Sequence, residues 1–518
     1  EAVKSVRPQW VVEIEGQVNQ RSENQVNKEL ATGTVEVLAK TFKVLNEAKT
    51  PPFEIDKDTK GVNEETRLKY RYLDLRRPKI QKYMAARHSA AQAARDYLNK
   101  HDFLEIETPI LIKSTPEGAR DYIVPSRVNP GTFYALPQSP QLYKQILMVA
   151  GFDRYYQLAR CLRDEDLRQD RQPEHTQIDL EMSFVEQKDV MDLVEGCAKH
   201  LLQVIAGKKE EKPFPILTYD EAMDKYGVDK PDLRFGMELV DVTSVVKKSE
   251  FKVFAEAEQV KCIVAEKDFS RNDIDNLIEW AKANGAKGLA WMKVTDKGLD
   301  SSIVKFFSED IQKQLIKTTN AKKGSFIFFV ADKPKVVASV LGSLRNELAV
   351  RLKLIKPKEF KFCWIVDFPM FKYNEDEKRW EPEHHMFTSP QKQYIDKLES
   401  DPGKVKGELF DVVLNGVELG SGSIRVSDPK LQERIMKVYR YVSFGLLSVV
   451  AVLIFGSAAI ADTLIVDTKD PSRMQRFLKD YKCFSTLFNL KDPSDREMLA
   501  GFIARPYKGY HLKVVERK

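Results

Sequence analysis

The first 50 residues alternate between apolar and polar positions, which is the pattern of strands with one buried face. The alternation is clearest in segments 10–14 and 33–38. We interpret residues 1–50 as strands of a small barrel. Residues 51–79 begin with two prolines and predict a linker or hinge, because proline interrupts regular structure.

A long amphipathic helix is predicted for residues 80–98, where apolar residues recur every three to four positions. A strand should begin at Phe103 and end at Pro109, because proline cannot donate to a strand ladder. Segments 154–163 and 175–184 predict two more strands around a polar loop.

The second of these strands divides its side chains between two faces. We expect the apolar face, with Ile178 and Phe184, to pack into the core. The other face carries Gln177, Asp179 and Glu181. Two interpretations of this polar face remain open: the floor of a binding site, or the solvated side of an ordinary antiparallel strand.

The loop before that strand is dense in charge. Residues 160–171 hold four arginines and four acidic residues in twelve positions. A charged hairpin loop would explain this composition. A phosphate site would explain it as well, because guanidinium groups grip phosphate with two parallel hydrogen bonds.

A hairpin is predicted around Asn415-Gly416, which is a strong two-residue turn signal. In that register residue 413 faces 418 and residue 411 faces 420, so Asp411 and Glu418 should share one face. Two carboxylates on one face suit Mg²⁺, which prefers oxygen ligands. Arg425 should point to the opposite face unless a bulge within the glycine-rich segment 420–423 shifts it.

Two adjacent histidines, His384 and His385, lie in a predicted loop. Zinc would require further ligands at suitable spacing. Polar contacts to a nucleotide or another substrate are therefore the favoured interpretation over a metal site.

Composition places the chain among ordinary soluble proteins, with 42% hydrophobic and 31% charged residues, and excludes a disordered or fibrous class. The net charge of +6 suits a polyanionic partner and equally a solvated surface. Five separated cysteines without a CxxC pair argue against a disulfide framework and indicate a reducing cytoplasm. Because the sequence opens at Glu1 without a signal peptide, we expect it to begin partway into a longer protein.

Several long segments resemble one enzyme family. Residues 152–157, 163–168 and 171–179 are similar to motif 2 of class II aminoacyl-tRNA synthetases in its aspartate form. The helix that ends near Pro109 resembles motif 1. Segments 115–122 and 135–144 also resemble the aspartyl enzymes. From about residue 10 to 437, the sequence thus resembles the bacterial-type aspartyl-tRNA synthetases.

The resemblance implies an α+β fold, with the class II antiparallel sheet flanked by helices. It implies a partial OB-type anticodon-binding barrel over residues 1–50 and an α+β insertion domain. The implied boundaries are 51–79 for the hinge, 80–249 and 346–437 for the two parts of the catalytic core, 250–345 for the insertion and 438–518 for an atypical tail.

The implied activity is ATP-dependent ligation of L-aspartate to tRNA(Asp) through an aspartyl-adenylate, assisted by Mg²⁺, in a cytoplasmic homodimer joined through the motif 1 helix. Two alternatives stay open. One is a sister synthetase for asparagine or lysine, and the other is an impaired or membrane-tethered relative that binds tRNA. The sequence does not decide whether tRNA(Asn) is also a substrate.

The same resemblance implies roles for single residues in nucleotide binding. Arg163 should hold the α-phosphate of ATP, and Glu165 should lie near the adenine. Gln172 and His385 are further implied nucleotide contacts. Asp411 and Glu418 should bind Mg²⁺, and the implied catalytic residues are Arg163, Glu165 and Glu418.

Aspartate and tRNA contacts are implied in the same way. Arg425 should take the aspartate side-chain carboxylate, and Asp179 its ammonium group. Glu117 lies in a segment similar to the family's closing lid. The other implied aspartate contacts are Ser139, Gln141, Lys144 and His384, and Arg168 and Arg171 should meet the tRNA.

Two parts of the chain depart from the family pattern. The first strands of the barrel are missing, and no motif 3 follows Lys437. In its place, residues 441–461 form an uncharged run that is long enough for a membrane span and resembles a signal peptide. Three interpretations of this tail stay open: an unrelated reading frame, a membrane anchor and a divergent buried helix.

Overall fold

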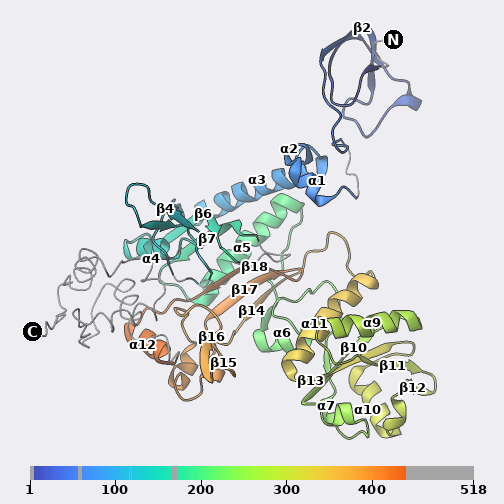
Figure 1. The fold of residues 1–518 in the computed structure, drawn as a ribbon, viewed down its shortest axis with the longest axis vertical. Helices are drawn as coiled ribbons and strands as arrows, with labels where there is room; N and C mark the ends of the chain where they lie inside the picture. The colour runs from blue at the N-terminus through green and yellow to red at the C-terminus, as the bar shows by residue number, and fades with distance from the viewer. Residues whose placement is uncertain (1–4, 57–60, 116, 118, 166–171, 439–518) are drawn as a thin grey trace, which may run out of the picture. The chain divides into compact units, whose positions relative to one another are not determined.

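The computed structural model describes residues 5–56, 61–115, 117, 119–165 and 172–438. Its contacts divide the chain into two compact units (Figure 1). The first unit comprises Glu1–Tyr97 and Lys199–Lys209, and the second comprises Leu98–Ala198 and Glu210–Lys518. Of the predicted tail, residues 438–518, only Val438 is among the described residues, and the uncharged run 441–461 lies outside them.

The sheet of the first unit pairs β1 (Val11–Gln20) with β2 (Val35–Asn46) in antiparallel register, joined through a short 3-10 turn, Glu23–Gln25. Alternation in the sequence therefore predicted its strands correctly. Their apolar side chains are largely solvent-exposed, with Val18 at 64% and Leu38 at 60%. Within the described part of this unit, the sheet has these two strands alone.

Three helices follow the first sheet: α1 (Glu64–Lys69), α2 (Arg71–Asp74) and α3 (Pro78–Asn99). The side chain of Asn63 caps α1 by accepting a hydrogen bond from the Glu65 amide. Helix α3 confirms the amphipathic helix predicted over residues 80–98. Its last two residues belong to the second unit.

The second unit contains a three-stranded sheet in the order β3-β6-β7. Strands β6 (Arg154–Leu162) and β7 (Glu174–Met182) are antiparallel and confirm the two predicted strands. Strand β3 (Leu104–Glu105) runs parallel to β6 and is shorter than predicted. The sheet is accompanied by a small hairpin of β4 (Ile123–Pro125) and β5 (Phe133–Ala135), and by helices α4 (Gln141–Val149) and α5 (Gln187–Ala206).

The predicted burial of the two faces of β7 is wrong. Ile178 is 42% exposed and Phe184 is fully exposed, whereas Asp179 is only 8% exposed. The polar face is the more buried one because α4 packs against it and places Lys144 over Asp179. Phe184 lies beyond the end of β7 with a positive φ of 55°, so strand alternation does not reach it.

A four-stranded sheet in the order β18-β17-β14-β8 lies in the same unit. Strand β14 (Phe362–Val366) runs antiparallel to β17 and parallel to β8 (Ile216–Thr218). Fully buried Cys363, Ile365 and Val413 form its core. The remaining strands are β17 (Leu409–Leu414), β18 (Val417–Ser423) and the hairpin β15 (Phe371–Asn374) and β16 (Arg379–Pro382), with 3-10 turns Lys392–Lys397 and Pro402–Lys404 and helix α12 (Pro429–Val438).

A five-stranded antiparallel sheet in the order β12-β11-β13-β10-β9 forms a further part of this unit (Figure 1). Its central strand β13 (Phe326–Asp332) is apolar on both faces, because helices cover both. The other strands are β9 (Val240–Asp241), β10 (Gln259–Ala265), β11 (Ala290–Thr295) and β12 (Gly298–Asp300). The helices are α7 (Thr243–Val246), α8 (Lys252–Ala255), α9 (Arg271–Ala283), α10 (Glu309–Thr319) and α11 (Pro334–Arg351), with a 3-10 turn Val304–Phe306.

Helix α11 also packs against α6 (Tyr219–Tyr226), which follows β8. A side chain at Gly342 would lie only 2.9 Å from the Tyr226 carbonyl oxygen, so glycine permits the close approach. Three residues further on, the buried Arg345 donates to the Asp232 and Phe235 carbonyls at 2.8 Å.

Together, these elements confirm the predicted α+β class with antiparallel sheets and flanking helices. The proposed domain boundaries stay predictions. The five-stranded sheet already begins at Val240, before the predicted insertion starts at residue 250. Among the described ranges, none of the helices is both long and apolar enough to cross a membrane.

Candidate active site

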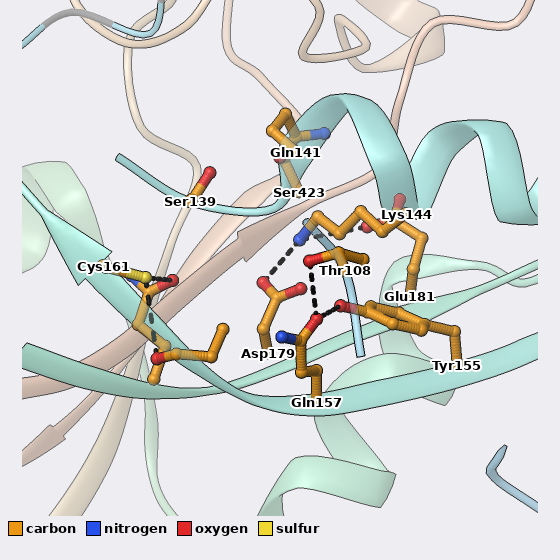
Figure 2. A network of polar contacts seen from close by, with 12 residues as sticks. Thr108, Ser139, Gln141, Lys144, Tyr155, Gln157, Cys161, Asp179, Glu181 and Ser423 are labelled. Carbon is orange, nitrogen blue, oxygen red and sulfur yellow. Dashed lines mark hydrogen bonds and ion pairs between the residues drawn. The ribbon is translucent and has the colours of Figure 1, made fainter. Parts of the chain in front are cut away.

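The floor of the candidate site is a buried ion pair between α4 and β7 (Figure 2). The ammonium group of Lys144 lies 2.8 Å from Oδ1 of Asp179 and 3.3 Å from Oε2 of Glu181. The other Asp179 oxygen, Oδ2, is buried and has no hydrogen-bond partner among the described residues. Because a buried acceptor without a partner is costly, this oxygen suits a ligand donor.

A second layer of polar side chains supports this floor. The hydroxyl groups of Tyr155 and Thr108 both donate to Oε1 of Gln157, each at 2.9 Å (Figure 2). Gln157 pairs across the strands with Asp179. Burial and the nearby Asp179 carboxylate raise the pKa of Tyr155, so its hydroxyl keeps its proton and acts as a donor.

Arg425, two residues after the end of β18, joins the floor. Its Nη2 donates to Oε1 of Gln141 at 3.3 Å, and its Nε lies 3.6 Å from Glu181. Glu181 therefore links the two cations, Lys144 and Arg425. The Nε2 amide nitrogen of Gln141 is a buried donor that has no partner in the ranges that the structure describes.

A bulge in β18 accounts for the position of Arg425. Val413 pairs with Glu418 as predicted, but Asp411 pairs with Ser421 instead of residue 420. The register shifts between Val412 and Val413, which leaves Leu419 as the extra residue. The predicted pairing of 411 with 420 is thus wrong, and the shift continues the face of Asp411 toward Arg425.

The two histidines lie beside this arginine. Nη1 of Arg425 lies 2.8 Å from Nε2 of His385, whose ring stacks on Phe387 at a centroid distance of 4.0 Å. Burial and the charge of Arg425 lower the pKa of His385 to about 3, so this ring is neutral at physiological pH. His384 packs edge-on against Phe368, and burial lowers its pKa as well.

Asp411 and Glu418 are placed on one face of the hairpin, as predicted. Asp411 is 8% exposed, whereas Glu418 is solvent-exposed. Burial, followed by the charges of Glu418 and Asp229, raises the pKa of Asp411 to about 8. Among the described residues, no cluster of three or more His, Cys, Asp or Glu side chains could hold a metal ion.

Glu117 and Ser139, two predicted aspartate contacts, bind each other. The Ser139 hydroxyl donates to Oε2 of Glu117 at 2.6 Å, and Thr115 donates to Oε1 at 3.0 Å. Burial raises the pKa of Glu117, while these two hydrogen bonds and the charge of Arg163 oppose that rise. Glu117 is therefore tied to Ser139 and Thr115 through its own carboxylate.

Three of the predicted nucleotide contacts, Arg163, Glu165 and Gln172, lie between the end of β6 and the start of β7. Arg163 is half-buried, and its backbone amide donates to the Pro173 carbonyl at 2.8 Å. Its Nε atom is buried and finds no hydrogen-bond partner within the described part of the chain. Glu165 and Gln172 are exposed. The predicted tRNA contacts Arg168 and Arg171 lie outside the described residues.

Three site residues carried no predicted role: Glu181, Ser423 and Thr388. Alternation along β7 already placed Glu181 on the face of Asp179, which was an available signal. Ser423 contacts His385 from 38 residues further along the chain, whereas Thr388 lies only three residues after His385, outside any periodic pattern. Cys161 also lies here, donating to Gln177 at 3.3 Å, and burial raises the pKa of its thiol to about 11.

Comparison with known proteins decides the family. The model of "tRNA synthetases class II (D, K and N)" matches residues 63–442, which is more than half of the chain. The chain belongs to the class II tRNA synthetases. It is 53% identical over 445 residues to "Aspartate--tRNA(Asp/Asn) ligase" of Anoxybacillus flavithermus, covering 84% of this chain and 75% of that protein.

Other relatives of this synthetase carry similar names. "Aspartate--tRNA ligase" of Ruminiclostridium cellulolyticum is 50% identical over 442 residues, covering 84% of this chain and 74% of that protein. Among solved structures, the Entamoeba histolytica asparaginyl-tRNA synthetase with asparaginyl-adenylate has a TM-score of 0.46 at 16% identity. That comparison covers 84% of this chain and 73% of the other.

Proposed function

We propose that this synthetase joins L-aspartate to tRNA(Asp), using ATP and an aspartyl-adenylate intermediate. The observation that supports this proposal most strongly is a pair of cations, Lys144 and Arg425, which both contact Glu181. Beside them, Oδ2 of Asp179 has no hydrogen-bond partner among the described residues. Relatives that are 53% and 50% identical to this chain are named aspartate ligases, which also supports this choice. The asparagine and lysine alternatives are not favoured.

Aspartate offers one cation and two anions, and the site offers complementary groups. Asp179 Oδ2 accepts a hydrogen bond from the substrate ammonium, and Arg425 with Lys144 faces the side-chain carboxylate. Asparagine carries no charge on its side chain, so it would leave a buried cation without its partner and bind more weakly. Further contacts to aspartate come from Glu117, Ser139, Gln141 and His384.

Adenylate formation needs no base, because the α-carboxylate is already ionised at neutral pH. Its oxygen bonds to the α-phosphorus of ATP as the bond to pyrophosphate breaks. Arg163 holds the α-phosphate, with Glu165, Gln172 and His385 as further nucleotide contacts. Positioning and charge stabilisation then account for catalysis. The 3′-terminal hydroxyl of tRNA next attacks the adenylate carbonyl and releases AMP.

Asp411 and Glu418 fit a Mg²⁺ ion. Two carboxylates on one face suit this ion, which commonly takes one or two carboxylates together with substrate phosphates. Burial, followed by the charge of Glu418, raises the pKa of Asp411, and a bound cation would favour its ionised form. When bound, Mg²⁺ neutralises phosphate charge. Glu418 acts from the exposed side of the pair and Asp411 from the buried side.

Contacts outside the centre complete the proposal. Arg168 and Arg171 meet the tRNA acceptor end, and the sheet of residues 1–50 contributes to anticodon binding. The helix α3 joins two copies in a homodimer, supported by Tyr83 and Met84, which are 58% and 56% exposed. The four described cysteines are free and buried, which suits a reducing cytoplasm.

Aminoacylation tests the proposal. Purified chain is incubated with ATP, Mg²⁺ and transcripts of tRNA(Asp) and tRNA(Asn), together with labelled L-aspartate or, in parallel reactions, labelled asparagine or lysine. Both transcripts are included because relatives at similar identity are named for one or both tRNAs. We expect label on tRNA(Asp), lost in Arg163→Ala. Labelling of the same tRNA by asparagine or lysine would overturn the substrate assignment.

A further inference from the structure

We infer that Thr388 is a positioning residue for aspartate recognition, because its hydroxyl group fixes the tautomer of His385 that holds Arg425. The inference rests on the proposed function and adds to it a residue outside the aspartate contacts. Its basis is a chain of three contacts: Thr388 Oγ1 to His385 Nδ1 at 3.1 Å, His385 Nε2 to Arg425 Nη1 at 2.8 Å, and Arg425 Nε to Glu181 at 3.6 Å.

The position of the proton on His385 follows from its neighbours. A guanidinium group has donors and no acceptor, so the contact with Arg425 requires a lone pair on Nε2. The Ser423 hydroxyl, 3.3 Å from Nε2, already accepts from Arg425 and can direct its own proton to the same lone pair. A neutral imidazole with an unprotonated Nε2 carries its proton on Nδ1. Nδ1 therefore donates to the Thr388 hydroxyl.

Thr388 is itself held in one orientation. It is 2% exposed, and its backbone pairs with that of Arg425 in an isolated bridge. Its methyl group lies over Gly407, where an added side chain would come within 3.0 Å of it. Because a β-branched side chain has few χ1 choices, a fixed methyl group also fixes the hydroxyl toward His385.

Removing the hydroxyl should disturb this arrangement. Nδ1–H of His385 would lose its acceptor in a buried place, which is costly. The other tautomer would turn an N–H of Nε2 toward the Arg425 guanidinium, so two donors would face each other. Either outcome loosens the position of Arg425, which we propose binds the aspartate side chain. The expected defect is in aspartate binding and in rejection of asparagine.

The test compares Thr388→Val, which keeps the shape and removes the hydroxyl, with Thr388→Ser, which keeps the hydroxyl. ATP–pyrophosphate exchange is measured on the full chain against aspartate and asparagine concentration. We expect T388V to raise KM for aspartate about tenfold, equal to about 1.4 kcal/mol, with a smaller change in kcat. T388S should restore most of the difference.

Thr319→Val is the matched control. Thr319 is 7% exposed, and its hydroxyl donates to the Leu315 carbonyl within α10, away from the site residues. We expect T319V to leave the KM for aspartate unchanged, although both variants lose one buried hydroxyl. Melting temperatures of the variants check that each chain folds.

The outcomes separate this inference from the proposed function. If the wild-type chain shows no aspartate-dependent exchange, the proposed function fails. If it does exchange and T388V retains the wild-type KM and the wild-type preference over asparagine, the role of Thr388 is overturned. Equal defects in T388V and T388S would also overturn it, because they would assign the effect to packing instead of the hydroxyl.

Discussion

The Nζ atom of Lys144 lies 2.8 Å from Oδ1 of Asp179, and both side chains are buried, at 6% and 8% exposure. Burying one ion of such a pair alone is expensive, so the two charges depend on each other. Glu181 adds a second anion, and Arg425 a second cation. The site is thus an alternating set of charges whose signs complement the ammonium and carboxylate groups of an amino acid.

Replacing Lys144 by methionine should destabilise the chain and abolish aspartate binding. Asp179 and Glu181 would remain buried without their ammonium partner, at a cost of about 3–5 kcal/mol. Unfolding by urea measures this change. Lys188→Met is the control, because Lys188 is 81% exposed in a surface ion pair with Asp192 and its loss should change stability little. Equal stability of the two variants would contradict the buried charge set.

Arg425→Gln should weaken aspartate binding and reduce the preference over asparagine. Glutamine keeps polar atoms but loses the charge opposite the substrate carboxylate, so we expect about a 100-fold rise in KM for aspartate. Exchange kinetics with both amino acids measure this. Arg434→Gln is the control. Arg434 lies in α12 and forms an ion pair with Glu399 near the surface, so its replacement should leave both KM values near those of the wild type. A comparable effect of the two substitutions would argue against a substrate role for Arg425.

Acid should destabilise the chain partly through His385. Burial and the charges of Arg425, His384 and Lys144 lower its pKa from 6.5 to about 3 in the folded state. Its contribution is therefore complete above pH 6.5 and is lost as the pH falls toward 3, because the unfolded chain takes up the proton first. The limiting slope from this one group is about 1.4 kcal/mol per pH unit.

Melting temperatures measured between about pH 7 and about pH 4 test this contribution, because this range spans the ordinary pKa of histidine. His385→Gln should show a shallower fall with pH than the wild type, whatever its stability at pH 7. Parallel curves for the two chains would show that His385 does not carry the expected proton linkage.

Gly416→Ala should disturb the hairpin that carries Asp411 and Glu418. Gly416 has a φ of +83°, and an added side chain would lie 3.3 Å from Cβ of Asp232. Gly131→Ala is a close control, because Gly131 has the same φ of +83° with no atom within 4 Å of the added group. Backbone strain of about 1–2 kcal/mol is common to both variants.

The difference between the two glycine variants isolates the contact with Asp232. We expect G416A to lose more stability than G131A and also to need more Mg²⁺ for exchange. Unfolding by urea and titration with Mg²⁺ measure the two effects. If the G131A and G416A variants lose the same stability and need the same Mg²⁺ concentration, the hairpin tip tolerates the contact with Asp232.

Local pattern was sufficient for several elements. Apolar spacing predicted helix α3, alternation predicted β6 and β7, and Asn415-Gly416 predicted the turn between β17 and β18. The side chains brought together at the centre, such as Lys144 and Asp179, were inferred from the family resemblance. No pattern within either segment shows that α4 covers β7.

Long-range packing explains what the sequence did not predict. The buried face of β7 was assigned wrongly because α4, which covers it, lies more than 30 residues earlier in the chain. The bulge at Leu419 was expected only as a possibility within residues 420–423, since both registers satisfy the turn. The contact between Thr388 and His385 is local, but it lies outside the helices and strands, where no periodicity marks it.

ATP–pyrophosphate exchange on the purified full chain tests the central claim most directly. Aspartate, asparagine and lysine are supplied in parallel with ATP and Mg²⁺. Exchange driven by aspartate alone is the predicted result, and it would show that residues 439–518 do not prevent adenylate formation. Exchange driven by asparagine or lysine, or no exchange with any of the three, would contradict the assignment of this chain as an active aspartate ligase.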